Sequence, residues 1–364
     1  MHICLIGNGL TNLILAKNLV KKKIKVDLYS TKKKQAKLSS RTIGVSEENI
    51  KFLRNNEIDI IKLSWQINQI KIFNELNQHK EILNFIYEKK SRFSILSNDQ
   101  FYEYIKKKLS KEPFFKKKII KNNLFYKNIF SEKKYDLVIN SVSDNAIAKK
   151  IFFKKINKNY LSNAYTSIIK HKKNKNKVAS QIFTSVGPLA FLPVSETETS
   201  IVFSISNRIK IENDNDIKEL ILKYNKNYNI ISFSSFNKFA LNFSVLKNYH
   251  HNNFLAFGDC LHKIHPLAGQ GFNMNLRDIK ILSDLIDENL KLGLPLDNLI
   301  LKEFEKKTRH LNYIFSSGID FIYEFFMFDN KTENNYSKKI FDFLNKNEIF
   351  NRYTSEFANK GLIL

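Results

Sequence analysis

The chain has 364 residues, 43% hydrophobic and 26% charged, so it is long enough for one large or two ordinary domains and its composition excludes wholesale disorder. Its two cysteines, Cys4 and Cys260, lie far apart, which excludes a disulfide framework and a cysteine-based metal cluster and suits a reducing compartment. The start has no basic segment before an apolar stretch, and no apolar run approaches the ~18 residues of a membrane span. We therefore expect neither a signal peptide nor a transmembrane helix.

The formal net charge of +25 comes mainly from lysine, because only seven of the 60 basic residues are arginine. A nucleic-acid partner, an anionic membrane surface or a compositional bias would each produce such a charge. Direct reading of bases favours arginine, and lysine runs such as residues 21–23 and 106–108 contain none. We interpret most of the charge as a solvated surface and keep membrane or anion attraction open. A nucleic-acid partner is not favoured.

The first predicted elements are a buried strand at residues 2–6, a helix at 10–22 and a second strand at 24–29. The turn between the first two is Gly7-Asn8-Gly9, and such a glycine turn lets the backbone meet a pyrophosphate at a helix N-terminus. The third glycine of the usual fingerprint is replaced by Asn12, and the acidic residue expected on the ribose is replaced by Ser30. A plain strand-to-helix turn therefore remains the alternative interpretation.

The middle of the chain carries mostly strand signals. We expect a helix at residues 100–109 on the outside of the first domain and place residues 61–85 on the substrate side. Strand patterns then predict a sheet across residues 151–250, with strands at 165–169, 191–194, 201–206 and 240–246.

The most informative stretch follows a predicted buried strand at residues 253–257. Residues 258–278 read GDCLHKIHPLAGQGFNMNLRD, and a helix is predicted from there to about residue 290. Asp259 ends the strand, where a carboxylate can accept hydrogen bonds from a polyol. The Gly269-Gln270-Gly271 segment lets the backbone pass close to a flat ring, and its N–H groups and helix dipole offer positive potential to an electron-rich carbonyl.

The C-terminal part is predicted to contain two helices within residues 298–328, with polar sequence after residue 330. Their aromatic and aliphatic side chains form one face, which we interpret as core. A border of a lipid-substrate tunnel, or contact with a membrane or partner, stays open. The face comprises Ile314, Ile319, Phe321, Ile322, Phe325 and Phe326.

Three segments of the chain, taken together, resemble the motifs of one known family. Residues 258–278 resemble the GD motif of FAD-dependent aromatic hydroxylases, in the form found in the UbiH-like hydroxylases of ubiquinone biosynthesis. Residues 187–194 (GPLAFLPV) and 40–46 (SRTIGVS) resemble two further motifs of that group, in the same order. The resemblance implies the fold of para-hydroxybenzoate hydroxylase. This fold is α/β, with a Rossmann-like FAD-binding domain, an interleaved and mainly antiparallel β-sheet substrate domain, and C-terminal helices.

The resemblance also implies a domain plan. Residues 1–150 would be the first part of the FAD-binding domain, residues 151–250 the substrate-binding sheet, residues 251–290 the returning part of the FAD-binding domain, and residues 291–364 a helical region.

By the same resemblance, cofactor-binding positions can be placed at both ends of FAD. The turn and first helical residues would hold the pyrophosphate, Arg41 would add charge at the adenosine–phosphate end, and Asp259 would bind hydroxyls. The backbone that follows Pro266 would line the flavin ring. The cofactor-binding residues are Gly7, Gly9, Leu10, Thr11, Arg41, Asp259, Pro266, Gly269, Gln270, Gly271, Phe272 and Asn273. The substrate-binding residues are Phe191, Pro193 and Pro266.

The implied activity is FAD-dependent hydroxylation of the ring of a polyprenylated phenol in ubiquinone biosynthesis, with NAD(P)H as co-substrate and O₂. No metal or catalytic side chain is assigned, and His262 and His265 are interpreted as packing or loop residues. The family's Asp-Gly near residues 135–141 is missing, since the sequence there continues as Val142-Ser143. The alternative is therefore a catalytically silent flavin-binding or scaffolding subunit of a ubiquinone-biosynthesis complex. We expect a cytoplasmic protein, with peripheral contact at the inner membrane surface left open.

Overall fold

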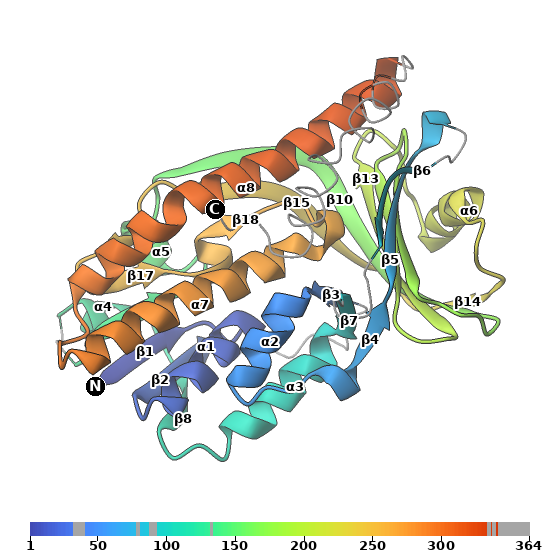
Figure 1. Ribbon diagram of the computed structural model, residues 1–364. Coiled ribbons are helices and arrows are strands. Elements are labelled where there is room, and N and C mark those ends of the chain that lie inside the picture. The colour runs from blue at the N-terminus through green and yellow to red at the C-terminus, as the bar shows by residue number, and fades with distance from the viewer. Residues whose placement is uncertain are drawn as a thin grey trace.

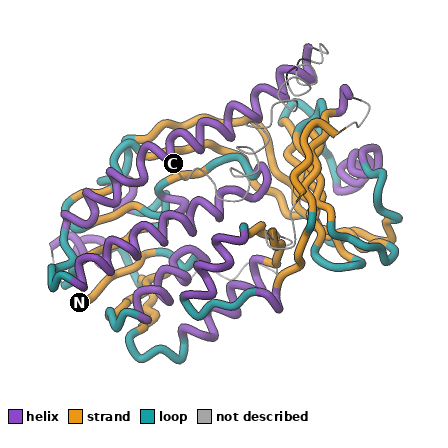
Figure 2. Tube along the Cα trace, viewed as in Figure 1, coloured by secondary structure: helices purple, strands orange, loops and turns teal. Residues whose placement is uncertain are grey.

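The computed structural model describes residues 1–31, 41–77, 81–86, 93–131 and 134–332, together with 336 and 340. Within these residues the chain forms three sheets, and helices lie between and around them (Figures 1 and 2). The largest sheet stands at one end of the molecule, with the long helices α7 and α8 on its inner side and α6 on its outer side. The α-helices are α1 (Leu10–Lys21), α2 (Glu47–Asn55), α3 (Asn98–Leu109), α4 (Leu124–Ser131), α5 (Ala146–Lys150), α6 (Asp214–Tyr224), α7 (Gln270–Lys291) and α8 (Asn298–Thr332).

A six-stranded sheet contains the chain's first strand at its centre. Its strands are parallel except for the edge strand β16, and β1 pairs with β2 on one side and β9 on the other. The apolar run at residues 3–6 is buried throughout, as is typical of a central parallel strand that is covered on both faces. In order across the sheet the strands are β16 (His250–His251), β17 (Phe254–Ala256), β9 (Leu137–Asn140), β1 (His2–Ile6), β2 (Lys25–Thr31) and β8 (Phe115–Ile120).

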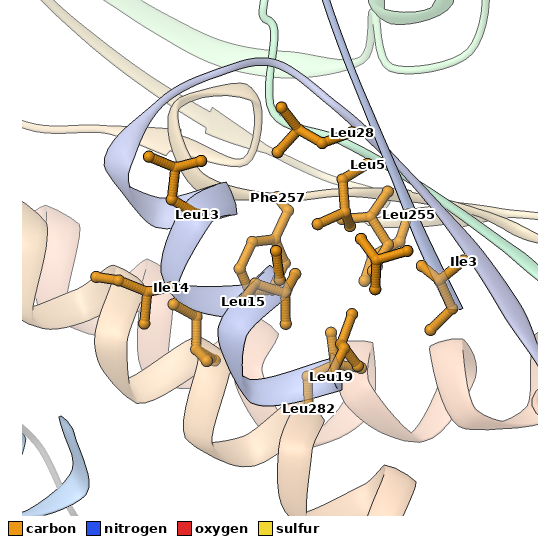
Figure 3. Packing of buried hydrophobic residues seen from close by; sticks show 14 of the residues in the cluster. Ile3, Leu5, Leu13, Ile14, Leu15, Leu19, Leu28, Leu255, Phe257 and Leu282 are labelled. Atoms are coloured by element: carbon orange, nitrogen blue, oxygen red, sulfur yellow. The ribbon is translucent and has the colours of Figure 1, made fainter. Parts of the chain in front are cut away.

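The core of this part lies between the sheet and helices α1 and α7. Figure 3 shows Ile14 and Leu19 of α1 in one cluster with Leu5 of β1 and Leu282 of α7, and all four side chains are fully buried. Burying a side chain of this size stabilises the fold by roughly 1.5–3 kcal/mol. The helix is buried on nearly every side, its polar residues Asn12, Lys17 and Asn18 included, because sheet and helices surround it. The predicted strand–helix–strand unit at the start of the chain is confirmed.

A nine-stranded sheet forms the second layer and is antiparallel except where β11 pairs with β5. The strands predicted at residues 165–169, 191–194, 201–206 and 240–246 coincide with β10, β12, β13 and β15. Residues 69–74 and 81–86 join the same sheet as β5 and β6, although the next strand of this sheet along the chain begins only at Lys155. The strands are β18 (His262–Lys263), β15 (Asn237–Leu246), β10 (Lys155–His171), β13 (Glu198–Ser206), β12 (Pro188–Pro193), β11 (Val178–Phe183), β5 (Gln69–Asn74), β6 (Glu81–Ile86) and β14 (Ile230–Phe233), which pairs with β10.

The small third sheet lies between the other two. Its order is β3 (Thr42–Val45), β7 (Phe93–Ser97) and β4 (Ser64–Ile67), all antiparallel. The Thr42 hydroxyl donates to Ser200 Oγ of β13 at 2.9 Å, so this sheet contacts the inner face of the nine-stranded sheet. The α/β fold class expected from the sequence is confirmed.

The prediction of two helices within residues 298–328 is wrong, because α8 is one helix of 35 residues. Gly318 lies in its middle, but a single glycine costs only about 1 kcal/mol in a helix, and packing along its length outweighs this. Its end is tied to the large sheet, where Phe326 stacks on Phe183 with ring centroids 3.8 Å apart and Asn74 donates to Asp329 at 2.9 Å.

The expected aromatic face of α8 divides into two. Ile319 and Phe326 are buried in a cluster with the large sheet, whereas Phe321 is 69% exposed and Ile314 is 48% exposed. None of the described helices, α8 included, offers a stretch long and apolar enough to cross a bilayer.

Candidate functional site

The two glycines of the first turn have different structural roles. Gly7 has φ +112°, and a Cβ there would lie 2.4 Å from Ser141 Oγ of the neighbouring strand end, so only glycine fits. Gly9 is the N-cap of α1 in extended conformation, and a Cβ there would meet no atom within 4 Å. Among the described residues no side chain caps the first turn of α1, so its N–H groups have no side-chain acceptor there. This arrangement is suited to an anion.

Asn12, which replaces the third glycine, supports the turn. It is fully buried, and its Nδ2 donates to Ile6 O at 3.1 Å and to Gly7 O at 2.8 Å. A side-chain amide thus fixes the backbone that glycines usually shape. The departure from the fingerprint leaves the turn intact.

A cavity of about 1170 Å³ opens beside this turn, at the carboxyl ends of β1, β2 and β8 and the residues that follow β9. Ligands bind at this edge of open parallel sheets. Ser30 lies in the cavity wall, where an acidic residue was expected. The sequence analysis missed the rest of the wall, although its residues follow strand ends and could have been found by that rule. The wall includes the aromatic residues Tyr29, Tyr126 and Phe130 and the lysines Lys121, Lys127, Lys149 and Lys150.

The GD motif meets the same turn from the other side. Gly258 has φ +56°, and a Cβ there would lie 3.5 Å from Thr11 of α1. Asp259 follows in a short 3-10 helix, η3 (Gly258–Cys260), and is exposed. Ser141, near the missing Asp-Gly, donates from Oγ to Ile6 O at 3.1 Å. We refer to the Gly7–Thr11 turn, Asp259 and the cavity as the ADP-side region.

The backbone of residues 266–273, which we call the ring-side loop, forms a second glycine-led helix start. The 3-10 helix η4 (Leu267–Gly269) leads into α7, whose N-cap Gly269 is left-handed at φ +65°. A Cβ on Gly269 would lie 3.3 Å from Gly44 N of β3, so the loop packs closely on that strand. In the part of the chain that the structure describes, no side chain caps the first turn of α7, which leaves backbone N–H groups for an electron-rich ligand atom.

The side chains of this loop mostly face the protein. Gln270 is buried, and Phe272 packs edge-to-face on Phe101 with ring centroids 6.3 Å apart. A Cβ on Gly271 would meet only the side chain of Ile264, at 3.6 Å. Any contact of the loop with a flat ring would therefore be made mainly by its backbone.

Asn273 ties the loop to the β3–α2 segment through both ends of its amide. Its Oδ1 accepts from Ser46 N at 3.1 Å and from Asn49 Nδ2 at 2.8 Å, and its Nδ2 donates to Gly44 O at 2.9 Å. Gly44 and Ser46 belong to the SRTIGVS segment, so two motifs distant in sequence are held together by one buried side chain.

Other sequence-predicted positions lie around these two regions. Arg41 is exposed, and its carbonyl accepts from Asn98 N at 3.0 Å, while Ser40 of the same motif lies outside the described residues. Leu10 is buried at the start of α1, and Pro266 is partly buried at the N-cap of η4.

The structure places Phe191 away from the ring-side loop. Its side chain is 2% exposed and packs with Tyr228 and the α6 residue Ile217, on the outer face of the large sheet. Pro193, two residues further along β12, is also buried. Alternate residues of a strand point to opposite faces. The inner face is therefore formed by neighbours such as Leu192, which packs with residues of the small sheet.

The two histidines of the GD motif differ. The His262 Nε2 lies 2.9 Å from Asp278 Oδ2 of α7, and both side chains are buried. His265 is buried against Tyr160 and Tyr323, and burial lowers the pKa of its imidazole to about 3.

The residues present fit FAD at both ends. Two helix starts led by glycine and uncapped by side chains, α1 and α7, lie at one edge of the parallel sheet, and Asn275 Nδ2 joins them by donating to Thr11 Oγ1 at 3.2 Å. The first start faces space without side chains beside a cavity large enough for a nucleotide.

Comparison with known proteins agrees with this geometry. A family model described as "Squalene epoxidase" matches residues 150–357. The chain is 30% identical over 149 residues to the 3-demethoxyubiquinol 3-hydroxylase of Escherichia coli K12, covering 39% of this chain and 38% of that protein. It is 25% identical over 190 residues to the mitochondrial ubiquinone biosynthesis monooxygenase COQ6 of Caenorhabditis elegans, covering 41% and 42%. The matched segment thus spans about two fifths of each relative.

Solved structures share the fold over nearly the whole chain. The p-nitrophenol 4-monooxygenase PnpA of Pseudomonas putida DLL-E4 aligns with a TM-score of 0.78 over 99% of this chain and 98% of that one, at 12% identity. PqsL of Pseudomonas aeruginosa, a probable FAD-dependent monooxygenase, aligns with a TM-score of 0.70 over 94% and 100%, also at 12% identity.

Proposed function

Because the chain belongs to the squalene epoxidase family, we propose that it is an FAD-dependent monooxygenase that hydroxylates the aromatic ring of a polyprenylated phenol in ubiquinone biosynthesis. The observation that carries the proposal is the pair of uncapped helix starts at one sheet edge, one beside a nucleotide-sized cavity and one in the ring-side loop. The sequence relatives, named for ubiquinone biosynthesis, support the substrate class.

In this proposal the backbone of the ADP-side region binds the pyrophosphate. The N–H groups of Leu10 and Thr11 and the positive end of the α1 dipole offset its charge, while Gly7 and Gly9 let it approach. Asp259 is exposed, directly after Gly258, whose Cβ position lies 3.5 Å from Thr11, and it accepts hydrogen bonds from the cofactor's hydroxyls. Arg41 adds positive charge at the adenosine–phosphate end.

The ring-side loop orients the flavin. The backbone of Gly269, Gln270 and Gly271 lies against it, and the N-terminus of α7 stabilises negative charge on the ring. When bound, FAD supplies the redox chemistry by which NAD(P)H and O₂ add one oxygen atom to an electron-rich ring. The protein orients the substrate against the flavin ring and excludes water from the space between them.

Pro266 remains the proposed substrate contact at this loop. In the GPLAFLPV segment the Phe191 side chain packs in the core on the outer face of the large sheet. We therefore propose that the backbone of this segment and inner-face side chains such as Leu192 form the wall of the substrate site opposite the ring-side loop. The buried cluster of α8 and the large sheet, which contains Phe183 and Phe326, would border the path of the prenyl tail.

We also propose peripheral contact with a membrane surface. The exposed side of α8 presents Ile314, Phe321 and Phe328, seven residues apart, and the chain carries a net charge of +25. Apolar side chains on one helix face together with excess lysine suit an anionic lipid surface. Sedimentation with anionic but not neutral vesicles, lost in Phe321→Glu, would support this contact.

Purification tests the proposal directly. We expect a yellow protein whose flavin is bleached by NAD(P)H in the presence of a prenylated phenol. Bound flavin that NAD(P)H cannot reduce, even with the phenol present, would instead indicate a silent flavin-binding subunit. A colourless protein that takes up no FAD would contradict both functions.

The Asp259→Ala variant tests the cofactor site. We expect at least tenfold weaker FAD retention. The melting temperature of the apoprotein should not change, because the carboxylate is exposed and supports no described part of the fold. Normal retention would exclude the role assigned to Asp259.

A further inference from the structure

His265 is a buried imidazole without a hydrogen bond. Its side chain is 1% exposed, and neither Nδ1 nor Nε2 has a partner among the residues that the structure describes. Burial lowers the pKa of this imidazole to about 3, so the ring is neutral near pH 7, with one N–H donor and one acceptor nitrogen.

His262, three residues earlier, provides the contrast within the same motif. Its Nε2 is 2.9 Å from Asp278 Oδ2, and Asn312 Nδ2 also donates to that oxygen at 3.3 Å. The first histidine thus has an evident structural bond, between the GD motif and α7, and the second has none among the described side chains.

The surroundings of His265 are aromatic and lie next to the ring-side loop. Its ring stacks on Tyr323 of α8 at 4.4 Å between centroids and meets Tyr160 of β10 edge-on at 5.2 Å. The backbone turns immediately after it, since Leu267 N donates to His265 O at 2.8 Å, and Pro266 between them is only partly buried. Leu267, Met274 and Phe315 continue the apolar cluster around the tyrosines.

A buried polar group without a partner lowers stability, and an apolar side chain of similar size would avoid that cost. The unpaired imidazole of His265 lies beside Pro266, the proposed substrate contact, and its nitrogens are therefore available to bind a ligand atom. A phenol hydroxyl both donates and accepts, so it can pair with either nitrogen of a neutral imidazole.

We propose that His265 is a substrate-positioning residue that hydrogen-bonds the ring hydroxyl of the phenolic substrate, while Tyr160 and Tyr323 hold its imidazole in place. This inference rests on the proposed function and adds to it the atom by which the substrate is recognised. It also means that a ring without a free hydroxyl is bound less tightly.

The test compares three probes, 2-prenylphenol, its methyl ether and prenylbenzene. Binding to the FAD-loaded protein is followed by the change in the flavin absorbance spectrum and by the ligand-induced shift in melting temperature. We expect the wild-type protein to prefer the phenol by about tenfold, since one hydrogen bond in a buried site is worth about that factor.

His265→Leu should lose this preference while melting at the same or a higher temperature without ligand, because it removes an unpaired polar group. His265→Gln, whose amide keeps a donor and an acceptor, should retain part of the preference. His262→Leu is the matched control. It should melt at a lower temperature because it removes the shorter of the two hydrogen bonds to the buried Asp278 and leaves the one from Asn312, and it should keep the preference for the phenol.

Several outcomes would overturn the assignment. A wild-type protein that binds FAD but shows no preference for the phenol, or a His265→Leu variant that keeps the full preference, would show that this histidine does not bind the hydroxyl. Both outcomes leave the proposed function standing. If His265→Leu does not fold, His265→Gln decides. Complete loss of the preference for the phenol in this variant would count against the proposal. A wild-type protein that takes up no FAD removes the proposed function and this inference together.

Discussion

The ADP-side region and the ring-side loop both consist of a glycine turn and the start of a helix, but they are held in different ways. At the ADP side, no atom of the described residues lies within 4 Å of the Cβ position of Gly9, and Asn12 stabilises the turn by donating a hydrogen bond to Gly7 O. At the ring side, Gly269 packs within 3.3 Å of Gly44, and Asn273 bonds to the same strand. The helix start of the first region is open at Gly9, although Gly7 before it is closely packed, whereas the helix start of the second region forms a packed joint with β3.

This difference explains which parts of the sequence depart from the family pattern. Backbone N–H groups at a helix start bind an anion whatever the side chains are. The ADP side can therefore carry Asn12, Ser30, Val142 and Ser143 at irregular positions. The ring-side loop depends on particular side chains and on glycines at close contacts, so its motif is preserved in full.

The largest effect is expected from Asn273→Ala, which breaks the ring-side joint. The change leaves Ser46 N and Gly44 O, both buried, without their partner, and should lower the free energy of unfolding by about 2–4 kcal/mol. Chemical denaturation measures the loss. Asn275→Ala, which removes one bond to Thr11, should cost about 1 kcal/mol, and equal losses in both variants would contradict the special role of the joint.

Gly9→Val tests the open surface. The extended backbone and the free space at Gly9 accept a side chain, so we expect a stability change below about 1 kcal/mol, yet the valine would occupy the pyrophosphate position. FAD affinity should fall at least tenfold, as measured by titration of the apoprotein. Gly318→Ala, in the middle of α8, should leave FAD affinity unchanged; FAD binding in Gly9→Val equal to wild type would place the pyrophosphate elsewhere.

Ser30→Asp tests the ADP side by placing at the end of β2 the acidic group that the usual fingerprint has there. Because Ser30 lies in the cavity wall, a carboxylate there can accept from a ribose hydroxyl, and FAD affinity should rise by about threefold. Asn174→Asp, which adds the same charge at an exposed position outside the cavity wall, is the control and should give no gain. A drop in affinity for Ser30→Asp would mean that the ribose is not near this strand end.

The smallest expected effect is a change in how stability depends on pH, through Asp27 of β2. Burial alone would raise the pKa of Asp27, but hydrogen bonds from Lys118 and Tyr135 outweigh it and hold the pKa below its usual value. A carboxyl group with a lowered folded-state pKa stabilises the fold above its unfolded-state pKa. That stabilisation is lost as the pH falls below about 4 and through the folded-state pKa.

Asp27→Asn should flatten the acid part of the stability profile. Asp284→Asn should steepen it, because burial raises the pKa of Asp284 and the sign is opposite. Denaturation midpoints between pH 3 and 7 would measure both slopes, and parallel profiles for the two variants would refute the assignment.

Much of the fold followed from local patterns. The buried strand at residues 2–6, the helix predicted from residue 278 to about 290 and the strand at 201–206 carry their periods in the sequence, although α7 begins earlier, at Gln270. The single helix α8 was missed because nothing local shows that packing against α7 and the large sheet outweighs Gly318. The side of the sheet on which Phe191 lies was also missed, because strand periodicity gives two faces without saying which one α6 covers.

The sequence by itself determined the α/β class, the family resemblance and the glycine turns, because these depend on residue types at short spacing. Only the tertiary structure decided that Asn273 joins two motifs about 230 residues apart, that lysines and aromatic residues from separate strand ends share one cavity, and that His262 is paired while His265 is not. The reason is physical. Whether a polar side chain has a partner depends on contacts between distant segments, and their distance in space is set by packing.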